Sequence, residues 1–128
     1  MAISQKKSNR KPSGAKLTTY RKKKSFELGR APTLTKIGER KIKKMRVLGG
    51  NIKNAIMSTN TINVYLPKTK NFKKATIKDV KENPANRHFV RRNIITKGVI
   101  LDTSVGLVKV TSRPGQEPSL NGILVENK

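Results

Sequence analysis

The sequence contains no cysteine and no tryptophan, and only 4% of its residues are aromatic. The lack of cysteine excludes disulfide bonds and thiolate metal sites, and it fits a reducing compartment without requiring one. No apolar run approaches the roughly 20 residues that a membrane helix needs. The first residues, MAISQKK, lack the apolar stretch of a signal peptide. We therefore expect a soluble, intracellular protein.

Acidic residues are also scarce, with seven Asp and Glu in 128 residues. General acid–base catalysis usually needs a histidine or paired carboxylates. Asp79 and Glu82 are the nearest pair of carboxylates, but both border a turn, where solvated charges are the simpler interpretation. The single histidine, His88, has no carboxylate after it to orient its ring. The sequence thus predicts no enzyme and no metal site. Base stacking, a phosphate contact and a plain loop position remain open for His88.

Positive charge dominates what is present. Thirty Lys and Arg give a net charge of +23 and a pI near 11.0. A compact domain with this charge repels itself unless a polyanion neutralises it, and nucleic acid offers a matching phosphate array. An anionic membrane would call for an amphipathic helix with apolar anchors, which we do not find. The few aromatics argue against a base-stacking platform and favour contact with the backbone and shape of a folded RNA.

The charge is concentrated toward the N-terminus. Residues 1–50 carry 16 basic and 2 acidic side chains, whereas residues 98–128 carry 3 of each and are neutral. Residues 1–38 mix cations with Ser, Asn, Pro and Gly, and their apolar residues are scattered singly. Such a segment cannot bury enough apolar area to offset its ordering entropy. We expect residues 1–38 to form an extended basic arm that is disordered alone and ordered on RNA.

Residues 39–128 have the pattern of short strands without a convincing helix. Residues 61–66 alternate polar and apolar side chains, and Pro67 then ends the strand. Further candidates are residues 73–80, 91–101, 105–110 and 120–126, and Gly49-Gly50-Asn51 is a plausible hairpin turn within residues 41–58. We predict an all-β fold, a small closed or partly closed β-barrel. Its expected core is Ile56, Ile62, Val64, Leu66, Ile77, Ile94, Val99, Leu101, Val108, Val110, Ile123 and Val125.

The stretch "NPANRHFVRRNIITKG", residues 83–98, joins a turn, a group of cations and an apolar run. A strand from residue 87 onward would place Arg87, Phe89 and Arg91 on one face and the residues between them on the other. We expect Phe89 and Val90 to anchor the stretch on the barrel. The cations would then face RNA, but not as one flat stripe.

Guanidinium groups can fork onto phosphates or stack on bases, whereas lysines act as more diffuse charges. The basic clusters therefore supply the candidate RNA-binding residues. These are Arg10, Lys11, Lys16, Arg21, Lys22, Lys23, Lys24, Arg30, Arg46, Arg87, His88, Arg91, Arg92, Lys97 and Arg113.

Six stretches resemble one known family in its own order along the chain. They are "NRKPSGAK" (9–16), "FELGR" (26–30), "TKIGERK" (35–41), "RVLGGN" (46–51), "ENPANRHFVRRNIITKGVI" (82–100) and "VTSRPGQ" (110–116). The chain is similar to the archaeal and eukaryotic family of ribosomal protein number eight of the small subunit. The direct turn at "PKTKN" resembles the archaeal form. The bacterial protein of the same number is a different family.

The resemblance implies a structural component of the cytoplasmic ribosome, bound to small-subunit rRNA and neighbouring ribosomal proteins. It implies a β-barrel body, a basic extension threaded among rRNA helices, and no enzymatic activity, cofactor or small-molecule substrate. We also expect no homo-oligomer. Composition alone leaves one other hypothesis open, a chromatin-type protein that coats duplex DNA. A third hypothesis, a hydrolase or nuclease that uses His88, is disfavoured because acid–base partners for His88 are missing.

Overall fold

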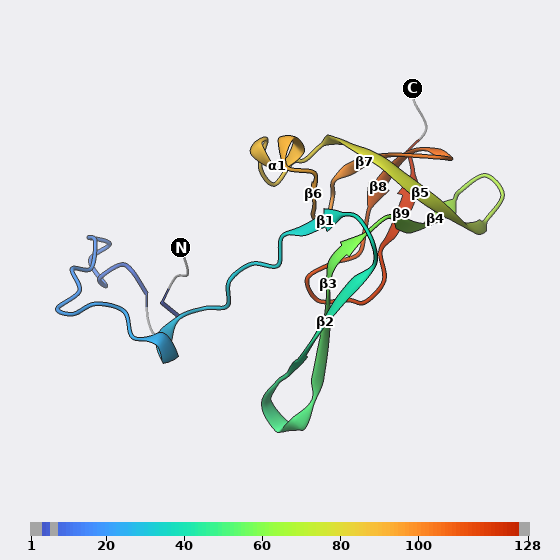
Figure 1. Cartoon of the computed structure of the whole chain (residues 1–128). Coiled ribbons are helices and arrows are strands. Elements are labelled where there is room, and N and C mark those ends of the chain that lie inside the picture. The colour runs from blue at the N-terminus through green and yellow to red at the C-terminus, as the bar shows by residue number, and fades with distance from the viewer. Residues whose placement is uncertain (1–3, 6–7, 126–128) are drawn as a thin grey trace. The chain divides into compact units, whose positions relative to one another are not determined.

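The computed structural model describes residues 4–5 and 8–125 (Figure 1). The chain divides into two compact units, Met1–Pro32 and Thr33–Lys128. The division falls at Pro32 rather than after residue 38, where the sequence suggested that the arm ends. The reason is that β1 (Thr35–Ile37) pairs with two strands of the second unit.

The first unit has little regular structure. Its described residues contain one 3-10 helix, η1 (Ser25–Glu27), and two isolated bridges, Ser4 with Leu28 and Arg10 with Lys16. None of its described residues, 4–5 and 8–32, is buried. This segment therefore builds no apolar core from those residues, in keeping with its scattered apolar side chains.

The second unit is a β structure, so the predicted all-β class and barrel are confirmed. Five strands form a closed barrel in the order β4-β5-β7-β8-β9. They are β4 (Thr61–Leu66), β5 (Asn71–Glu82), β7 (Ile100–Thr103), β8 (Gly106–Val110) and β9 (Asn121–Leu124). Neighbouring strands run antiparallel except β4 and β9, whose parallel pairing closes the barrel. Closure leaves none of these strands at an open sheet edge.

A second sheet has the order β2-β3-β1-β6. Besides β1, the strands of this sheet are β2 (Lys41–Arg46), β3 (Ile52–Thr59) and β6 (Ile94–Ile95). β2 and β3 form a hairpin whose far end projects from the sheet (Figure 1). The predicted turn is confirmed: Gly49 and Gly50 have φ angles of 74° and 76° within the short helix η2 (Leu48–Gly50). Glycine adopts this left-handed backbone without steric penalty.

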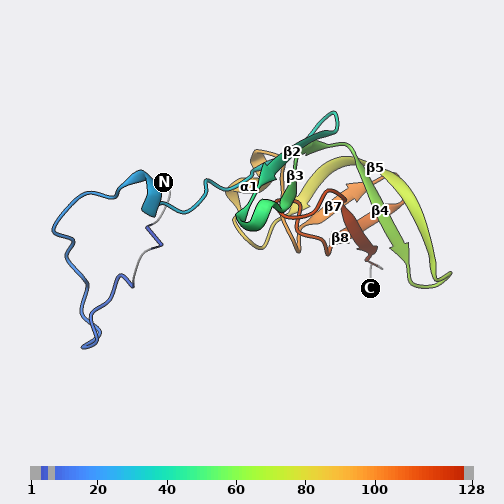
Figure 2. The same cartoon turned by 90° about the horizontal axis from the view of Figure 1, so that it is seen from below.

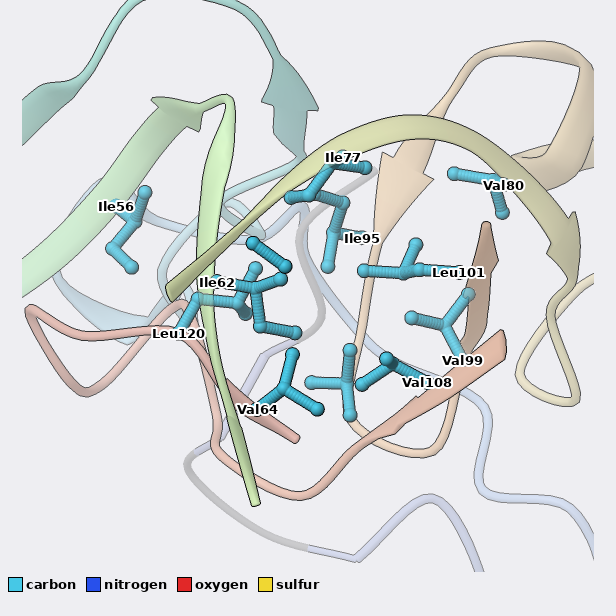
Figure 3. Packing of buried hydrophobic residues seen from close by; sticks show 12 residues of the cluster. Ile56, Ile62, Val64, Ile77, Val80, Ile95, Val99, Leu101, Val108 and Leu120 are labelled. Atoms are coloured by element: carbon cyan, nitrogen blue, oxygen red, sulfur yellow. The ribbon is translucent and has the colours of Figure 1, made fainter. Parts of the chain in front are cut away.

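The core fills the barrel with branched aliphatic side chains (Figure 3). Alternation along β4 turns Ile62 and Val64 inward, and Leu101 and Val108 meet them from β7 and β8. Nine of the twelve predicted core residues are buried: Ile56, Ile62, Val64, Ile77, Ile94, Val99, Leu101, Val108 and Val110. Leu66 and Val125 are half-buried. Sequence reasoning missed Ala55, Ala75, Val80, Ile95 and Leu120, which are also buried.

Ile123 was wrongly placed in the core, because its side chain is 43% exposed. In β9 the inward position belongs to Gly122, which pairs with Val64 of β4 and Val110 of β8. Two-residue alternation then directs Ile123 outward.

One short α-helix lies among the described strands. It is α1 (His88–Arg91), between β5 and β6, in a stretch where the sequence pattern shows no convincing helix. No helix in the described part of the chain is both long and apolar enough to cross a membrane.

Candidate nucleic-acid interface

The cations of residues 87–92 lie on a helical turn, and the predicted strand there is wrong. Asn86 Oδ1 accepts a hydrogen bond of 2.9 Å from the His88 N–H at the start of the turn. Asn93 ends it with a φ of 49°, and its N–H donates to the Val90 carbonyl at 3.0 Å. Asparagine suits both places, since its side chain bonds to nearby backbone and tolerates the left-handed region.

The helical turn changes which side chains share a face. Residues three and four apart in a helix are neighbours on its surface, so the cations at 87, 88, 91 and 92 can lie together. All four are exposed, while Phe89 and Val90 are half-buried and Val90 packs against the core. The expectation that a strand splits these cations between two faces, so that they form no flat stripe, is therefore corrected, and the predicted anchoring by Val90 is confirmed.

The turn is held to the body by Asn83, which is only 5% exposed. Its Nδ2 donates to the Ile94 carbonyl at 3.1 Å. Its Oδ1 accepts from the Ala85 N–H and from Thr96 Oγ1, both at 3.0 Å. One buried amide thus joins the end of β5, the start of the α1 loop and the segment after β6. These three bonds fix where the cations leave the body.

Replacing this amide should loosen the turn. Asn83→Ala removes the partners of a buried carbonyl, an N–H and a hydroxyl, so we expect the free energy of unfolding to fall by about 2–3 kcal/mol. Urea denaturation measures this loss. Asn86→Ala is the matched control, since Asn86 is exposed and makes one such bond, and it should cost less than about 1 kcal/mol. Equal losses in the two variants would contradict the anchoring role of Asn83.

Lys97 joins the same surface from the segment between β6 and β7. It is exposed beside Gly98, which has a φ of 86°, and a Cβ on Gly98 would lie 3.6 Å from Pro84 Cγ. Thr96, which precedes Lys97 in the chain, is held by its hydrogen bond to Asn83. We call the group of Arg87, His88, Arg91, Arg92 and Lys97 the cationic turn.

Arg46 and Arg113 lie elsewhere on the second unit. Arg46 is exposed at the end of β2, opposite Ile52 in the projecting hairpin. Arg113 is exposed in the loop between β8 and β9, where the Pro114 carbonyl accepts a hydrogen bond of 2.8 Å from Ile56 N–H. The structure therefore does not gather all predicted body cations in one site.

The β2–β3 hairpin carries cations that sequence reasoning did not select. Adjacent residues of a strand point to opposite faces, so the cations of β2 occupy both faces of the hairpin. The stretch "KIKKMR" could have shown that these cations are exposed. Most of its residues are cations, and a strand with so few apolar residues presents its lysines to solvent. Besides the predicted Arg46, the exposed cations of the hairpin are Lys41, Lys43, Lys44 and Lys53.

The remaining candidates belong to the first unit. Six of them are exposed and lie on backbone without strand or helix or in an isolated bridge: Arg10, Lys11, Lys16, Lys22, Lys23 and Lys24. Arg30 is also exposed. The Arg10 guanidinium donates to the Gly14 carbonyl at 3.0 Å, across a turn in which Gly14 has a φ of 83°.

Arg21 is paired with a carboxylate of the same unit. Its guanidinium forms an ion pair with Glu27 and donates to Tyr20 Oη at 3.0 Å. The hydrogen bonds that Arg21 donates to the Glu27 carboxylate, with a smaller contribution from the one to Tyr20, raise the pKa of Arg21 above its ordinary value. A phosphate that binds Arg21 must therefore compete with a carboxylate.

The site offers little for catalysis or metal binding. His88 is exposed, and no ion pair or side-chain hydrogen bond joins it to another residue that the structure describes. Within residues 4–5 and 8–125, no three His, Asp or Glu side chains gather into a metal-binding group. The cationic turn instead presents positively charged side chains on backbone that Asn83 anchors.

Comparisons with known proteins point to one family. The family model described as Ribosomal protein S8e matches residues 4–125. The chain is 46% identical to small ribosomal subunit protein eS8 of Picrophilus torridus, over 98% of this chain and 100% of the relative. It is 50% identical to the protein of that name from Methanobrevibacter smithii over the same shares. The Nanoarchaeum equitans protein is 53% identical over 83% of this chain and 84% of its own length.

Proposed function

The chain belongs to the ribosomal protein S8e family, and from this premise we propose that it is a structural constituent of the small subunit of the cytoplasmic ribosome that binds small-subunit rRNA. The observation that carries the RNA-binding role is the cationic turn, five exposed cationic or titratable side chains on backbone that Asn83 anchors. The protein acts as one copy beside neighbouring ribosomal proteins, without catalysis, cofactor or small-molecule substrate.

The mechanism is neutralisation of phosphates where rRNA segments approach one another. Each phosphate that a Lys or Arg contacts releases condensed counterions, which favours binding at low salt. The cationic turn offers arginines on rigid backbone, which loses little entropy when it binds. The first unit would follow the RNA and gain order from it, so protease should cut it readily in the free protein.

The test is a salt titration of binding to a small-subunit rRNA fragment. We expect Arg91→Ala and Arg92→Ala each to lower the slope of log K against log salt by about 1 and to weaken binding roughly tenfold at about 0.1 M salt. Lys78→Ala is the matched control, because Lys78 is an exposed cation of β5 outside the cationic turn. If neither arginine changes the slope, the cationic turn is not the RNA contact.

A chromatin-type coat on duplex DNA is the alternative that charge alone allows. The same titration with DNA duplexes of unrelated sequence separates the two. Equal affinity for rRNA and for any DNA duplex would favour the alternative.

A further inference from the structure

Two of the chain's five aromatic residues face each other on the outside of the barrel. Tyr65 of β4 and Phe72 of β5 are register partners, with ring centroids 5.1 Å apart and planes tilted by 47°. Ile62 and Val64 of β4 point into the barrel, so strand alternation places Tyr65 on the outer surface. Phe72 is 77% exposed. Tyr65 is half-buried, and neither ring belongs to the core cluster of the barrel.

The rings begin a row that crosses four adjoining strands. Tyr65 pairs with Ile123 of β9, which is 43% exposed, and Ile123 pairs with Lys109 of β8. Lys109 is exposed and pairs in turn with the half-buried Ile100 of β7. Figure 2 shows β4 and β5 running side by side to their shared turn. The row is thus an outward strip of two rings and one aliphatic side chain beside a cation.

The next row on the same face is polar. Lys74 of β5 lies opposite Asn63 of β4, which pairs with Asn121 of β9. Asn63 Nδ2 donates to Asn121 Oδ1 at 3.0 Å. Asn63 Oδ1 and Asn121 Nδ2 have no partner among the described residues, so one acceptor and one donor lie side by side next to the rings. We call the two rows together the aromatic platform.

A nucleobase has the matching chemistry: a flat apolar face, hydrogen-bonding edges and a phosphate nearby. We propose that the aromatic platform binds unpaired bases of a single-stranded RNA segment. Phe72 and Tyr65 stack on the bases, as exposed rings on sheets do in RNA-binding modules. Asn63 and Asn121 contact a base edge, and Lys74 and Lys109 contact the phosphates.

Charge favours RNA over a protein as the occupant. Strands β4, β8 and β9 contain no acidic residue, and the acids of β5, Asp79 and Glu82, lie at its far end from Phe72. A protein that covered the rings with apolar side chains would also bury Lys74 and Lys109 without partners, which is costly. A phosphate backbone supplies those partners directly.

The inference rests on the proposed function in one respect, that the polyanion is RNA. The two contacts differ in kind, because the cationic turn binds phosphates of paired or unpaired RNA whereas the platform needs free base faces. A single-stranded oligouridine and an RNA duplex of equal length therefore separate the two proposals.

The experiment uses the full chain with Tyr20→Phe, so that Tyr65 is the only tyrosine in a protein without tryptophan. Oligouridine should quench the fluorescence of Tyr65, whereas the duplex should not. Phe72→Ala should weaken oligouridine binding about 5- to 100-fold and leave duplex binding within about twofold. Phe72→Trp should keep or strengthen oligouridine binding, which a variant that merely disturbs folding would not.

Phe26→Ala is the matched control, because Phe26 is also 77% exposed but belongs to the first unit, where the Lys24 ammonium and no aromatic ring of a described residue lies over it. It should bind oligouridine as the parent does. The proposal is overturned if Phe72→Ala leaves oligouridine binding unchanged, which would assign the platform to a protein partner. Equal losses on oligouridine and duplex would also overturn it.

Discussion

Neutralising the first unit should weaken binding to a small-subunit rRNA fragment by about 10³-fold or more at roughly 0.1 M salt. The change replaces with glutamine the eight candidate cations Arg10, Lys11, Lys16, Arg21, Lys22, Lys23, Lys24 and Arg30. Residues 1–32 hold ten basic and one acidic side chain, a net +9, which falls to +1 in this variant. The slope of log K against log salt should fall by about 4 if half of these cations contact phosphate.

Stability should not change in this variant, because none of the described residues of the first unit is buried. We expect the free energy of unfolding to stay within about 0.5 kcal/mol of the parent. The loss of RNA affinity can then be assigned to charge and not to unfolding. Isotherms at several salt concentrations, together with urea denaturation, measure both quantities.

A charge-preserving variant sharpens the result. Arg10→Lys, Arg21→Lys and Arg30→Lys together keep the net charge but remove the guanidinium forks. The salt slope should then stay near the parental value. An unchanged slope in the glutamine variant would instead show that the second unit, with its net +14, binds the RNA alone.

The barrel could be predicted because its signal is local. Residues 61–66 alternate over six positions, and β4 has those bounds. Reasoning from alternation fails for Ile123, because β9 has only four residues and its inward position is a glycine. Apolar content cannot show which face a short strand buries. That depends on pairing with β4 and β8, which are distant in sequence.

The identity of the cationic residues was easier to predict than their geometry. Arginines at 87, 91 and 92 had to face solvent or a partner, and they do. A four-residue helix is too short to show a helical period, and the β-branched run after it favours a strand. The asparagines at 86 and 93 were the local signal, because they suit the start and end of such a turn.

The aromatic platform was hidden by composition. Aromatics make up 4% of the chain, which argued against base stacking. Pairing concentrates them, however: the turn between β4 and β5 brings Tyr65 and Phe72 into register. The lesson is that a few rings can form a platform when a hairpin aligns them, whatever the average content.

Gly122→Ala should lower the free energy of unfolding by about 3 kcal/mol or more. A Cβ at this position would lie 2.5 Å from Val108 Cγ1, 2.9 Å from the Lys109 carbonyl oxygen and 3.1 Å from Ile62 Cδ1. Val108 and Ile62 are at most 1% exposed, so neither has room to retreat. The backbone oxygen belongs to β8, and moving it would disturb the pairing of β8 with β9.

Gly115→Ala separates the effect of space from the effect of removing a glycine. Neither position has a positive φ, and a Cβ on Gly115 would meet nothing closer than Thr33 Cβ at 3.7 Å. Alanine also restricts the unfolded chain, which by itself stabilises by about 0.4–1 kcal/mol. Gly115→Ala should therefore be neutral or slightly stabilising in urea denaturation. If Gly122→Ala unfolds at the same urea concentration as Gly115→Ala, β9 does not approach β4 and β8 as closely as this barrel requires.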